Sequence, residues 1–144
     1  MFEYGSGAST AFFAGLIDSV ISCEYDKEWY DFVLKTAPHN AKIIYIAEDE
    51  DGDYCRTIHT TDLTFDLILI DGRDRLNCIE QSIDRLTDRG VILLDDTHRP
   101  AYQVGFEALH KRGFRSLTFE GLKPLAKKMH STTIFYRDRN CLGI

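Results

Sequence analysis

The sequence predicts an α/β fold in which helices cover both faces of a mostly parallel sheet, a three-layer, doubly wound architecture. Apolar, β-branched segments alternate with helical patterns through most of the 144 residues. The stretch 65–72, FDLILIDG, contains an unbroken apolar run, which is typical of a parallel strand buried on both faces. No helical pattern separates the last two strand-like segments, so we expect them to pair with each other and to leave an antiparallel last strand.

The expected elements form a β–α repeat that ends in two strands. Ser9 is expected to cap the first helix, and Asp26 to cap the second. In the second helix, Trp29, Phe32 and Val33 have i, i+3, i+4 spacing and are expected to face the core. The expected strands are 1–4, 20–24, 43–46, 65–72, 91–96, 115–119 and 132–136. The expected helices are 9–17, 27–35, 78–86 and 100–112.

Composition and charge exclude several kinds of protein. A chain of this length suits a single domain over 1–144, and its net charge of -6 argues against a nucleic-acid partner, which would require a basic face. The sequence has no run of 18 apolar residues and no signal-peptide pattern, so we expect no membrane partner and a cytoplasmic location. The four cysteines form no CxxC pair and are expected to stay reduced.

A glycine-rich turn follows the first strand and predicts a cofactor loop. Gly5 and Gly7 allow a sharp turn and the close approach of a ligand. The motif reads G-x-G-x-x-T, because Thr10 stands where dinucleotide-binding folds carry a third small residue. Glu3 precedes the turn and would be a poor neighbour for a pyrophosphate. Glu24 lies 19 residues after Gly5, at the end of the second strand, which is where a carboxylate can hold a ribose diol.

At these residues the chain resembles the class I S-adenosylmethionine-dependent methyltransferases. Their signature is E-x-G-x-G followed by a ribose-binding acid, and the resemblance extends over essentially the whole chain. FDLILIDG looks like the fourth strand of their Rossmann-like fold, GVILLDD like its fifth, and the two-strand ending like its sixth and seventh. The stretches GSGAST, IDGRDR, DDTHR and FxGLxP together look like a little-described bacterial branch.

The resemblance implies S-adenosyl-L-methionine as the cofactor. It implies that the two glycines line the cofactor, that Glu3 faces the methionine end and that Glu24 holds both ribose hydroxyls. Either Glu48 or Asp49 would contact the adenine, and Asp71 would border the transferred methyl group. The expected cofactor-binding set is Glu3, Gly5, Gly7, Ser9, Glu24, Glu48 and Asp71.

The same resemblance implies methyl transfer, and a small molecule or a glycan is the favoured acceptor because nothing in the sequence marks a nucleic-acid groove. Asp71 is the first candidate to orient or deprotonate the acceptor, and His98 is the second, because a histidine titrates near neutral pH. Oxygen acceptors are favoured because the fourth strand is followed by Asp71-Gly72-Arg73 and not by the asparagine-proline motif of amino-methylating enzymes. Alternatives left open are a catalytically inactive binding module of the same fold, a nicotinamide oxidoreductase and a structural partner, including a homodimer.

A metal site is considered and not expected. Asp71, Asp95 and Asp96 could form an all-oxygen site for magnesium or calcium, and this region resembles metal-dependent catechol-type O-methyltransferases. Those enzymes carry a lysine where this chain has Asp74, and an Asp-Asn pair where it has Asp-Asp. The acidic run 48–53 is interpreted as a solvated loop, and the nearby arginines as partners of aspartates. Because the glycine turn begins at residue 5, we also expect the sequence to lack an N-terminal cap segment.

Overall fold

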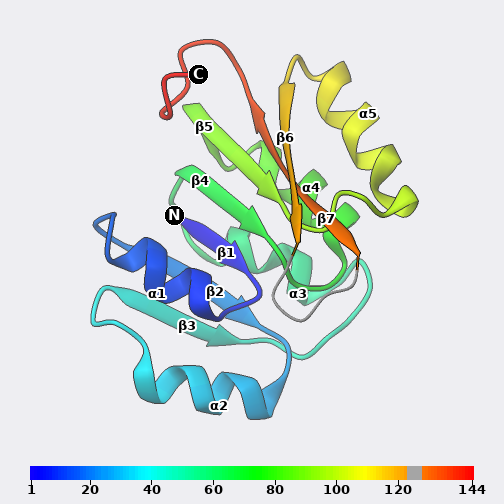
Figure 1. Ribbon diagram of the computed structural model, residues 1–144. Coiled ribbons are helices and arrows are strands. Elements are labelled where there is room, and N and C mark those ends of the chain that lie inside the picture. Colours follow the sequence, from blue (N-terminus) through cyan, green and yellow to red (C-terminus); the bar gives the residue numbers. More distant parts are fainter. Residues whose placement is uncertain (123–127) are drawn as a thin grey trace.

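The computed structural model describes residues 1–122 and 128–144 and shows one seven-stranded sheet (Figure 1). The strand order is β3-β2-β1-β4-β5-β7-β6. Strands β1 to β5 pair in parallel, and β7 runs antiparallel to both of its neighbours. The expected mostly parallel sheet with an antiparallel last strand is therefore confirmed. The strands are β1 (Phe2–Tyr4), β2 (Val20–Glu24), β3 (Ala41–Tyr45), β4 (Phe65–Ile70), β5 (Leu86–Leu94), β6 (Arg115–Leu122) and β7 (Met129–Tyr136).

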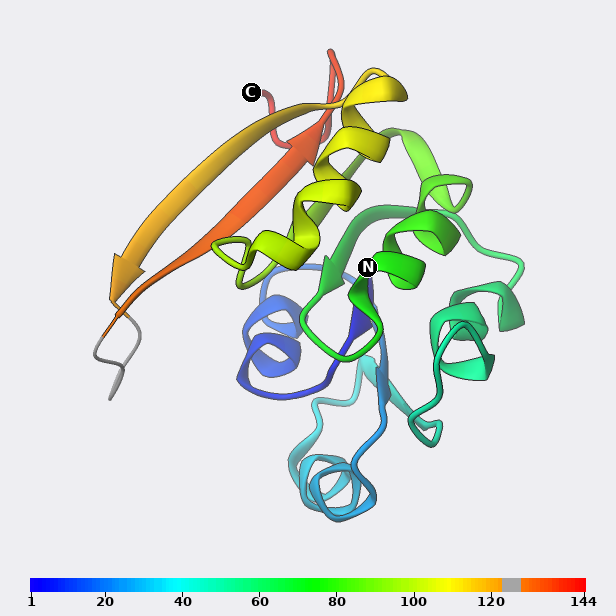
Figure 2. The same ribbon diagram turned by 90° about the vertical axis from the view of Figure 1, so that its right-hand side faces the viewer.

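Helices lie on both faces of this sheet, as the sequence pattern predicts. Figure 2 shows α1 (blue) on one side of the central strands and α4 (green) on the other. The main core lies between the sheet and the α3–α5 side, where apolar residues of the strands meet α3, α4 and α5. The helices are α1 (Ala8–Ala14), α2 (Lys27–Thr36), α3 (Asp53–Arg56), α4 (Arg75–Ile83) and α5 (Gln103–Lys111), with 3₁₀ turns η1 (Thr57–Thr60) and η2 (Pro100–Tyr102).

The connection after β3 contributes to the core, which the sequence did not predict. The polar stretch 48–62 contains α3 and η1, and Tyr54, Cys55 and Ile58 from it are fully buried. The acidic residues before α3 are exposed apart from the half-buried Asp49, whose carboxylate accepts hydrogen bonds from the backbone N–H groups of Asp53 and Tyr54. The acidic run therefore contains the residue that caps α3, because the Asp49 carboxylate satisfies N–H groups that have no partner within the helix.

The first two helices differ from their predicted details. Helix α1 begins at Ala8, so Ser9 lies inside it and the predicted Ser9 cap is wrong; the Thr10 hydroxyl accepts a 2.9 Å hydrogen bond from the Gly7 N–H instead. In α2 the predicted Asp26 cap is confirmed by a 2.9 Å bond from the Trp29 N–H. Of the three residues expected to face the core from α2, only Val33 is buried.

The C-terminal strands form a long antiparallel hairpin at one edge of the sheet. Their pairing extends from Arg115–Tyr136 to Leu122–Met129, and Figure 2 shows its outer end extending away from the helices. All eight residues of β6, the outermost strand on this side of the sheet, are exposed. Two residues of the FxGLxP stretch, Lys123 and Pro124, lie outside the described residues.

None of the helices within residues 1–122 and 128–144 has the length and apolar character needed to cross a membrane.

Candidate cofactor and active site

Two adjoining cavities open at the carboxyl ends of the parallel strands, where α/β sheets bind ligands. The first, of about 580 Å³, is lined by residues 5–9, the end of β2 and Trp29. The second, of about 490 Å³, is lined by residues 48–50, residues 71–76 and Arg99. Tyr25, Asp71 and Gly72 line both cavities. The structure thus gathers the loops after β1, β2, β3, β4 and β5 at one edge, as the sequence predicts.

The glycine turn packs directly against the loop after β4. Gly5 has φ +92°, and a Cβ there would lie 2.9 Å from both the Cα and the N of Gly72. A Cβ on Gly72 would lie 1.9 Å from the Tyr54 hydroxyl oxygen. That hydroxyl is buried near Cys23 and the Arg73 backbone and makes no hydrogen bond of normal geometry. Both glycines are therefore needed for the two loops to approach each other.

Glu24 holds together the two loops that line the first cavity. Its side chain is buried, and one carboxylate oxygen accepts bonds from the Ser6 N–H at 2.9 Å and the Ser6 hydroxyl at 3.0 Å. The other oxygen accepts bonds from the backbone N–H groups of Tyr25 at 2.9 Å and Asp26 at 3.0 Å. A carboxylate has about four acceptor positions, so the protein itself uses all of them. Ribose hydroxyls can bind Glu24 only by displacing one or more of these donors.

Glu3 lies behind the glycine turn and does not line either cavity. It is fully buried, and its two oxygens accept hydrogen bonds from the hydroxyls of Ser9 and Thr10 at the start of α1. Burial raises the pKa of Glu3 above its ordinary value of 4.5, and the hydroxyl donors oppose this shift. In this arrangement Glu3 and Ser9 fasten α1 to β1, and their contact with a cofactor stays a prediction.

Two aromatic residues of the first cavity were not predicted as site residues. Trp29 was expected in the core, but its side chain is exposed, and its indole N–H donates a 2.8 Å bond to the Ser6 carbonyl. Tyr25 follows Glu24 directly and carries the Arg73 guanidinium over its ring, 5.1 Å from the centroid. The position of Tyr25, next to the predicted ribose acid at a strand end, was a usable signal. The helical spacing of Trp29 predicted a core position, and that prediction is wrong.

The structure separates the two predicted adenine contacts. Glu48 lines the second cavity with an exposed side chain and lies 3.5 Å from the Arg73 guanidinium. Asp49 also lines this cavity, but both of its carboxylate oxygens accept bonds from the first N–H groups of α3. Glu48 is therefore the more available of the two carboxylates.

Asp71 stands at the end of β4 and is held by a buried arginine. Arg75 donates to the Asp71 carboxylate at 2.8 Å and to the Asp71 carbonyl at 2.9 Å, and it also reaches the carbonyls of Gly72 and Asp95. The Asp71 side chain is 44% exposed, against 8% for Arg75. Arg75 thus joins the loops after β4 and β5, and it keeps a carboxylate at the boundary of both cavities. The predicted pairing of arginines with nearby aspartates is confirmed for this pair.

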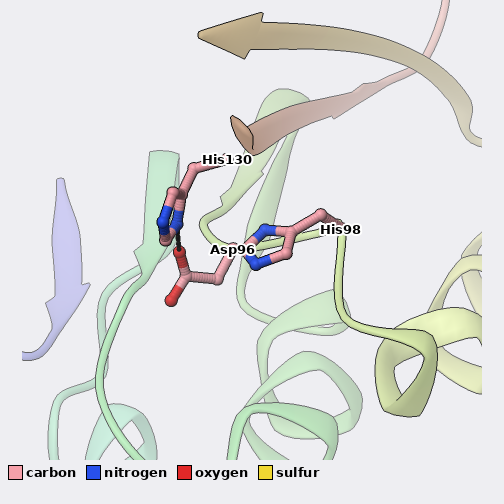
Figure 3. Close-up of side chains that lie close together, drawn as sticks. All are labelled: Asp96, His98 and His130. Carbon is pink, nitrogen blue, oxygen red and sulfur yellow. Dashed lines mark hydrogen bonds and ion pairs between the residues drawn. The ribbon is translucent and has the colours of Figure 1, made fainter. Parts of the chain in front are cut away.

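The predicted acids after β5 point to different partners. The Asp95 carboxylate accepts a hydrogen bond from the Thr132 hydroxyl of β7. Asp96 is buried, and its two oxygens contact His130 Nδ1 at 2.9 Å and the Arg99 guanidinium at 2.6 Å. Figure 3 shows Asp96, His98 and His130 pointing toward one another.

His130 belongs to this group and was missed from the sequence. It lies 34 positions after Asp96, and only the register of β7 brings it to the end of β5. The ring of exposed His98 stacks edge-on against that of His130, with centroids 4.6 Å apart. His98 is thus placed beside the acids, on the side of the site away from the glycine turn.

Comparisons with known proteins agree on the fold. A scan against protein-family models finds no match, and a search of curated proteins finds no relative. Among solved structures, an rRNA methylase from Streptococcus thermophilus matches with TM-score 0.68 and 17% identity over 95% of this chain and 87% of that one. The N-methyltransferase NodS from Bradyrhizobium japonicum WM9 matches with TM-score 0.66 and 14% identity over 94% and 84%. A spermidine synthase from Thermotoga maritima matches with TM-score 0.64 and 17% identity over 96% and 53%.

At these identities the comparisons show the fold alone. The chain has the Rossmann-like fold of class I S-adenosylmethionine-dependent methyltransferases, as the sequence resemblance predicts. Because a spermidine synthase shares that fold, the architecture by itself does not select methyl transfer.

Proposed function

We propose that this protein is an S-adenosylmethionine-dependent methyltransferase that acts on an oxygen of a small molecule or a glycan. The observation that carries the proposal is the buried Glu24 carboxylate beneath a glycine turn whose backbone packs against the loop after β4. A carboxylate at the end of the second strand suits a ribose diol. The cavity above it, about 580 Å³, lies within the range of small-ligand and cofactor sites.

The residues present fit S-adenosylmethionine. Glu24 would hold the ribose, the backbone of Gly5 and Gly7 would face the methionine portion, and Glu48 would accept a bond from the adenine. The carboxylate Asp71 lies where both cavities meet, so it can attract a sulfonium on one side and an acceptor hydroxyl on the other. When bound, this cofactor supplies an electrophilic methyl group on a positively charged sulfur.

The chain's own contribution is alignment of the reactants. Asp71 is held in place by Arg75 through a 2.8 Å ion pair, so it can hold an acceptor hydroxyl in line with the methyl group and receive its proton. A side chain that is partly exposed and fixed by a buried partner is well suited to this role. His98 lies farther along the same edge, beside Asp96.

A binding module without catalytic activity is the second candidate. It is favoured by the full occupation of Glu24, whose four acceptor positions already receive protein donors. In such a module the Glu24 carboxylate would stabilise the loop and would not bind a ribose.

Titration calorimetry with S-adenosylhomocysteine tests the proposal. We expect one site per chain and loss of binding in Glu24→Ala, with circular dichroism to confirm that the variant folds. Glu24→Gln is the companion variant, because it keeps the side-chain volume and part of the hydrogen bonding. Absence of binding by the intact protein would refute the proposal, and binding without transfer to any oxygen acceptor would favour the inactive module.

A further inference from the structure

A carboxylate and two imidazoles converge at the end of β5. Asp96, His98 and His130 each offer a ligand atom, and within residues 1–122 and 128–144 these atoms lie no more than 4.8 Å from one another (Figure 3). We infer that these three residues form a binding site for a divalent transition-metal ion of the zinc type. This trio differs from the acidic trio considered from the sequence, since it exchanges Asp71 and Asp95 for two histidines.

Hydrogen bonds made by Thr97 hold the loop that carries Asp96 and His98 against the strand that carries His130. The residue between Asp96 and His98 is Thr97, whose N–H donates a 2.8 Å bond to the Ser131 carbonyl. The Thr97 hydroxyl also lies 2.9 Å from the hydroxyl oxygen of Ser131 and 2.8 Å from that of Thr133. The loop after β5 is therefore fastened to the residues of β7 that directly follow His130. Such supporting bonds orient metal ligands in known sites.

The ligand chemistry selects the kind of ion. Imidazole nitrogens suit zinc, copper, iron and nickel, whereas magnesium and calcium prefer oxygen ligands only. Two histidines and a carboxylate are the protein ligands of many catalytic zinc sites, which keep a fourth position open. His130 Nδ1 lies 2.9 Å from an Asp96 oxygen, and either a proton or a metal ion can be held between these two atoms. The His130 side chain is only partly exposed, at 24%. His98 is exposed and can turn toward an ion at little cost.

The distances require only a small closure. In a tetrahedral zinc site the ligand atoms lie about 3.3 Å apart, given bonds of about 2.0–2.1 Å. The Asp96 oxygen and His130 Nδ1 are already 2.9 Å apart. The widest separation in the trio, at most 4.8 Å, exceeds that target by roughly 1.5 Å. His98 is the exposed member of the trio, so its side chain has room to move toward an ion.

Charge around the trio both favours and opposes a cation. Asp71, Asp95 and Asp96 contribute three carboxylates at this edge, against the guanidinium groups of Arg75 and Arg99. Arg99 competes most directly, because it contacts an Asp96 oxygen at 2.6 Å. Its side chain is 51% exposed, so it can move into solvent when an ion binds. Removal of the Arg99 charge should therefore strengthen metal binding.

The site borders a third cavity. His130 and Thr132 of β7, with residues 119–122 of β6, line a hollow of about 250 Å³. An ion at the trio would lie at one wall of this hollow and could bind an oxygen of a molecule held there, lowering the pKa of a hydroxyl. This last consequence rests on the proposed function, whereas the binding of the ion does not. His98 then serves as a metal ligand and not as the base of the proposed transfer.

Cobalt(II) binding to the protein without a polyhistidine tag tests the inference. Cobalt(II) substitutes for zinc and gives visible absorption bands whose intensity reports four- or five-coordination by nitrogen and oxygen. We expect one equivalent to bind per chain and to be displaced by zinc. His98→Ala and His130→Ala should each weaken binding at least about tenfold. Arg99→Gln should tighten it about three- to tenfold, because a competing positive charge is removed.

His39→Ala is the matched control, since His39 is exposed and lies outside the trio; its binding should be unchanged. A hydrogen-bonded Asp96–His130 pair without a metal role predicts no stoichiometric cobalt binding, and that result would overturn the inference. So would binding that persists in both histidine variants, or an Arg99→Gln variant with unchanged affinity. His98 is on an exposed loop, so its variant remains informative even if His130→Ala fails to fold. S-adenosylhomocysteine calorimetry on the same samples shows separately whether the proposed function stands.

Discussion

Ser6→Ala offers a sharp test of how Glu24 would receive a ribose. The Ser6 hydroxyl donates to a Glu24 oxygen at 3.0 Å, and the Ser6 N–H donates to the same oxygen at 2.9 Å. The substitution removes only the hydroxyl, so the backbone bond can stay. Of the four donors on Glu24, this hydroxyl is the one that a ribose hydroxyl can replace without breaking a backbone contact.

The size of the effect follows from that single bond. A hydrogen bond to a charged group contributes about 1.5–3 kcal/mol to stability, and Ser6 is 8% exposed, so water compensates only part of its loss. We expect the free energy of unfolding to fall by about 1–2 kcal/mol. In the complex a ribose hydroxyl takes over the acceptor position, so the variant loses nothing there. Affinity should therefore rise by about five- to thirtyfold, since 1.4 kcal/mol corresponds to tenfold.

The assay compares calorimetric titrations of S-adenosylhomocysteine with urea unfolding curves for the same two proteins. Ser116→Ala, on the exposed strand β6, is the control and should change neither quantity. Lower stability together with tighter binding is the expected pair of results. If stability and affinity fall together, the Ser6 hydroxyl contacts the ligand or Glu24 does not hold the ribose, and the displacement argument is wrong.

Three further substitutions test the scaffold of the site. Gly72→Ala should lower the free energy of unfolding by about 1–3 kcal/mol, because its Cβ would lie 1.9 Å from the Tyr54 hydroxyl oxygen. In a double-mutant cycle, Tyr54→Phe should recover much of this loss. Strictly additive effects of the two substitutions would contradict the clash. Glu3 has a raised pKa in the folded protein, so the stability it contributes is complete below pH 4.5, its ordinary value, and is lost as the pH rises through the folded pKa. Glu3→Gln should therefore gain stability relative to the unsubstituted protein as the pH rises above 4.5 in urea unfolding, and a difference that does not change with pH would rule this out. Arg75→Lys should cost about 2–4 kcal/mol in the same assay, because an ammonium cannot reproduce the guanidinium bonds to two loops; a loss below about 0.5 kcal/mol would show that Arg75 does not hold them together.

The features that were predicted correctly are those encoded locally. The β4 segment was recognisable because a run of apolar residues has few alternatives to a central strand, and Gly5 because a positive φ favours glycine. Asp26 could be assigned as a cap because the donor it satisfies lies three residues ahead. Spacing after the glycine turn placed Glu24 at the end of the second strand, which the structure confirms, and its binding of a ribose stays a prediction. The four protein donors on its carboxylate were not foreseeable from the sequence.

The features that were missed depend on contacts between distant segments. Helical spacing placed Trp29 in the core, but a hydrogen bond to the Ser6 carbonyl draws its ring to the cavity. The acidic residues around Asp49 concealed a helix whose Tyr54 fills the core. His130 joins Asp96 only through the pairing of β5 with β7 and the bonds made by Thr97, and no local pattern in the sequence reports that register.

The place of β1 in the sheet also has a consequence for how the protein folds. This three-residue strand lies near the centre of the sheet, and its Phe2 pairs with Ile21 on one side and with Ile68, 66 positions away, on the other. A contact between residues so far apart in the sequence requires a long loop to close before it adds to stability, so it forms slowly. Because the Gly5 turn rests on the loop after β4, we expect it to take shape only when β4 docks against β1. Competence to bind a cofactor should then appear in the same kinetic phase as the complete sheet and not before it.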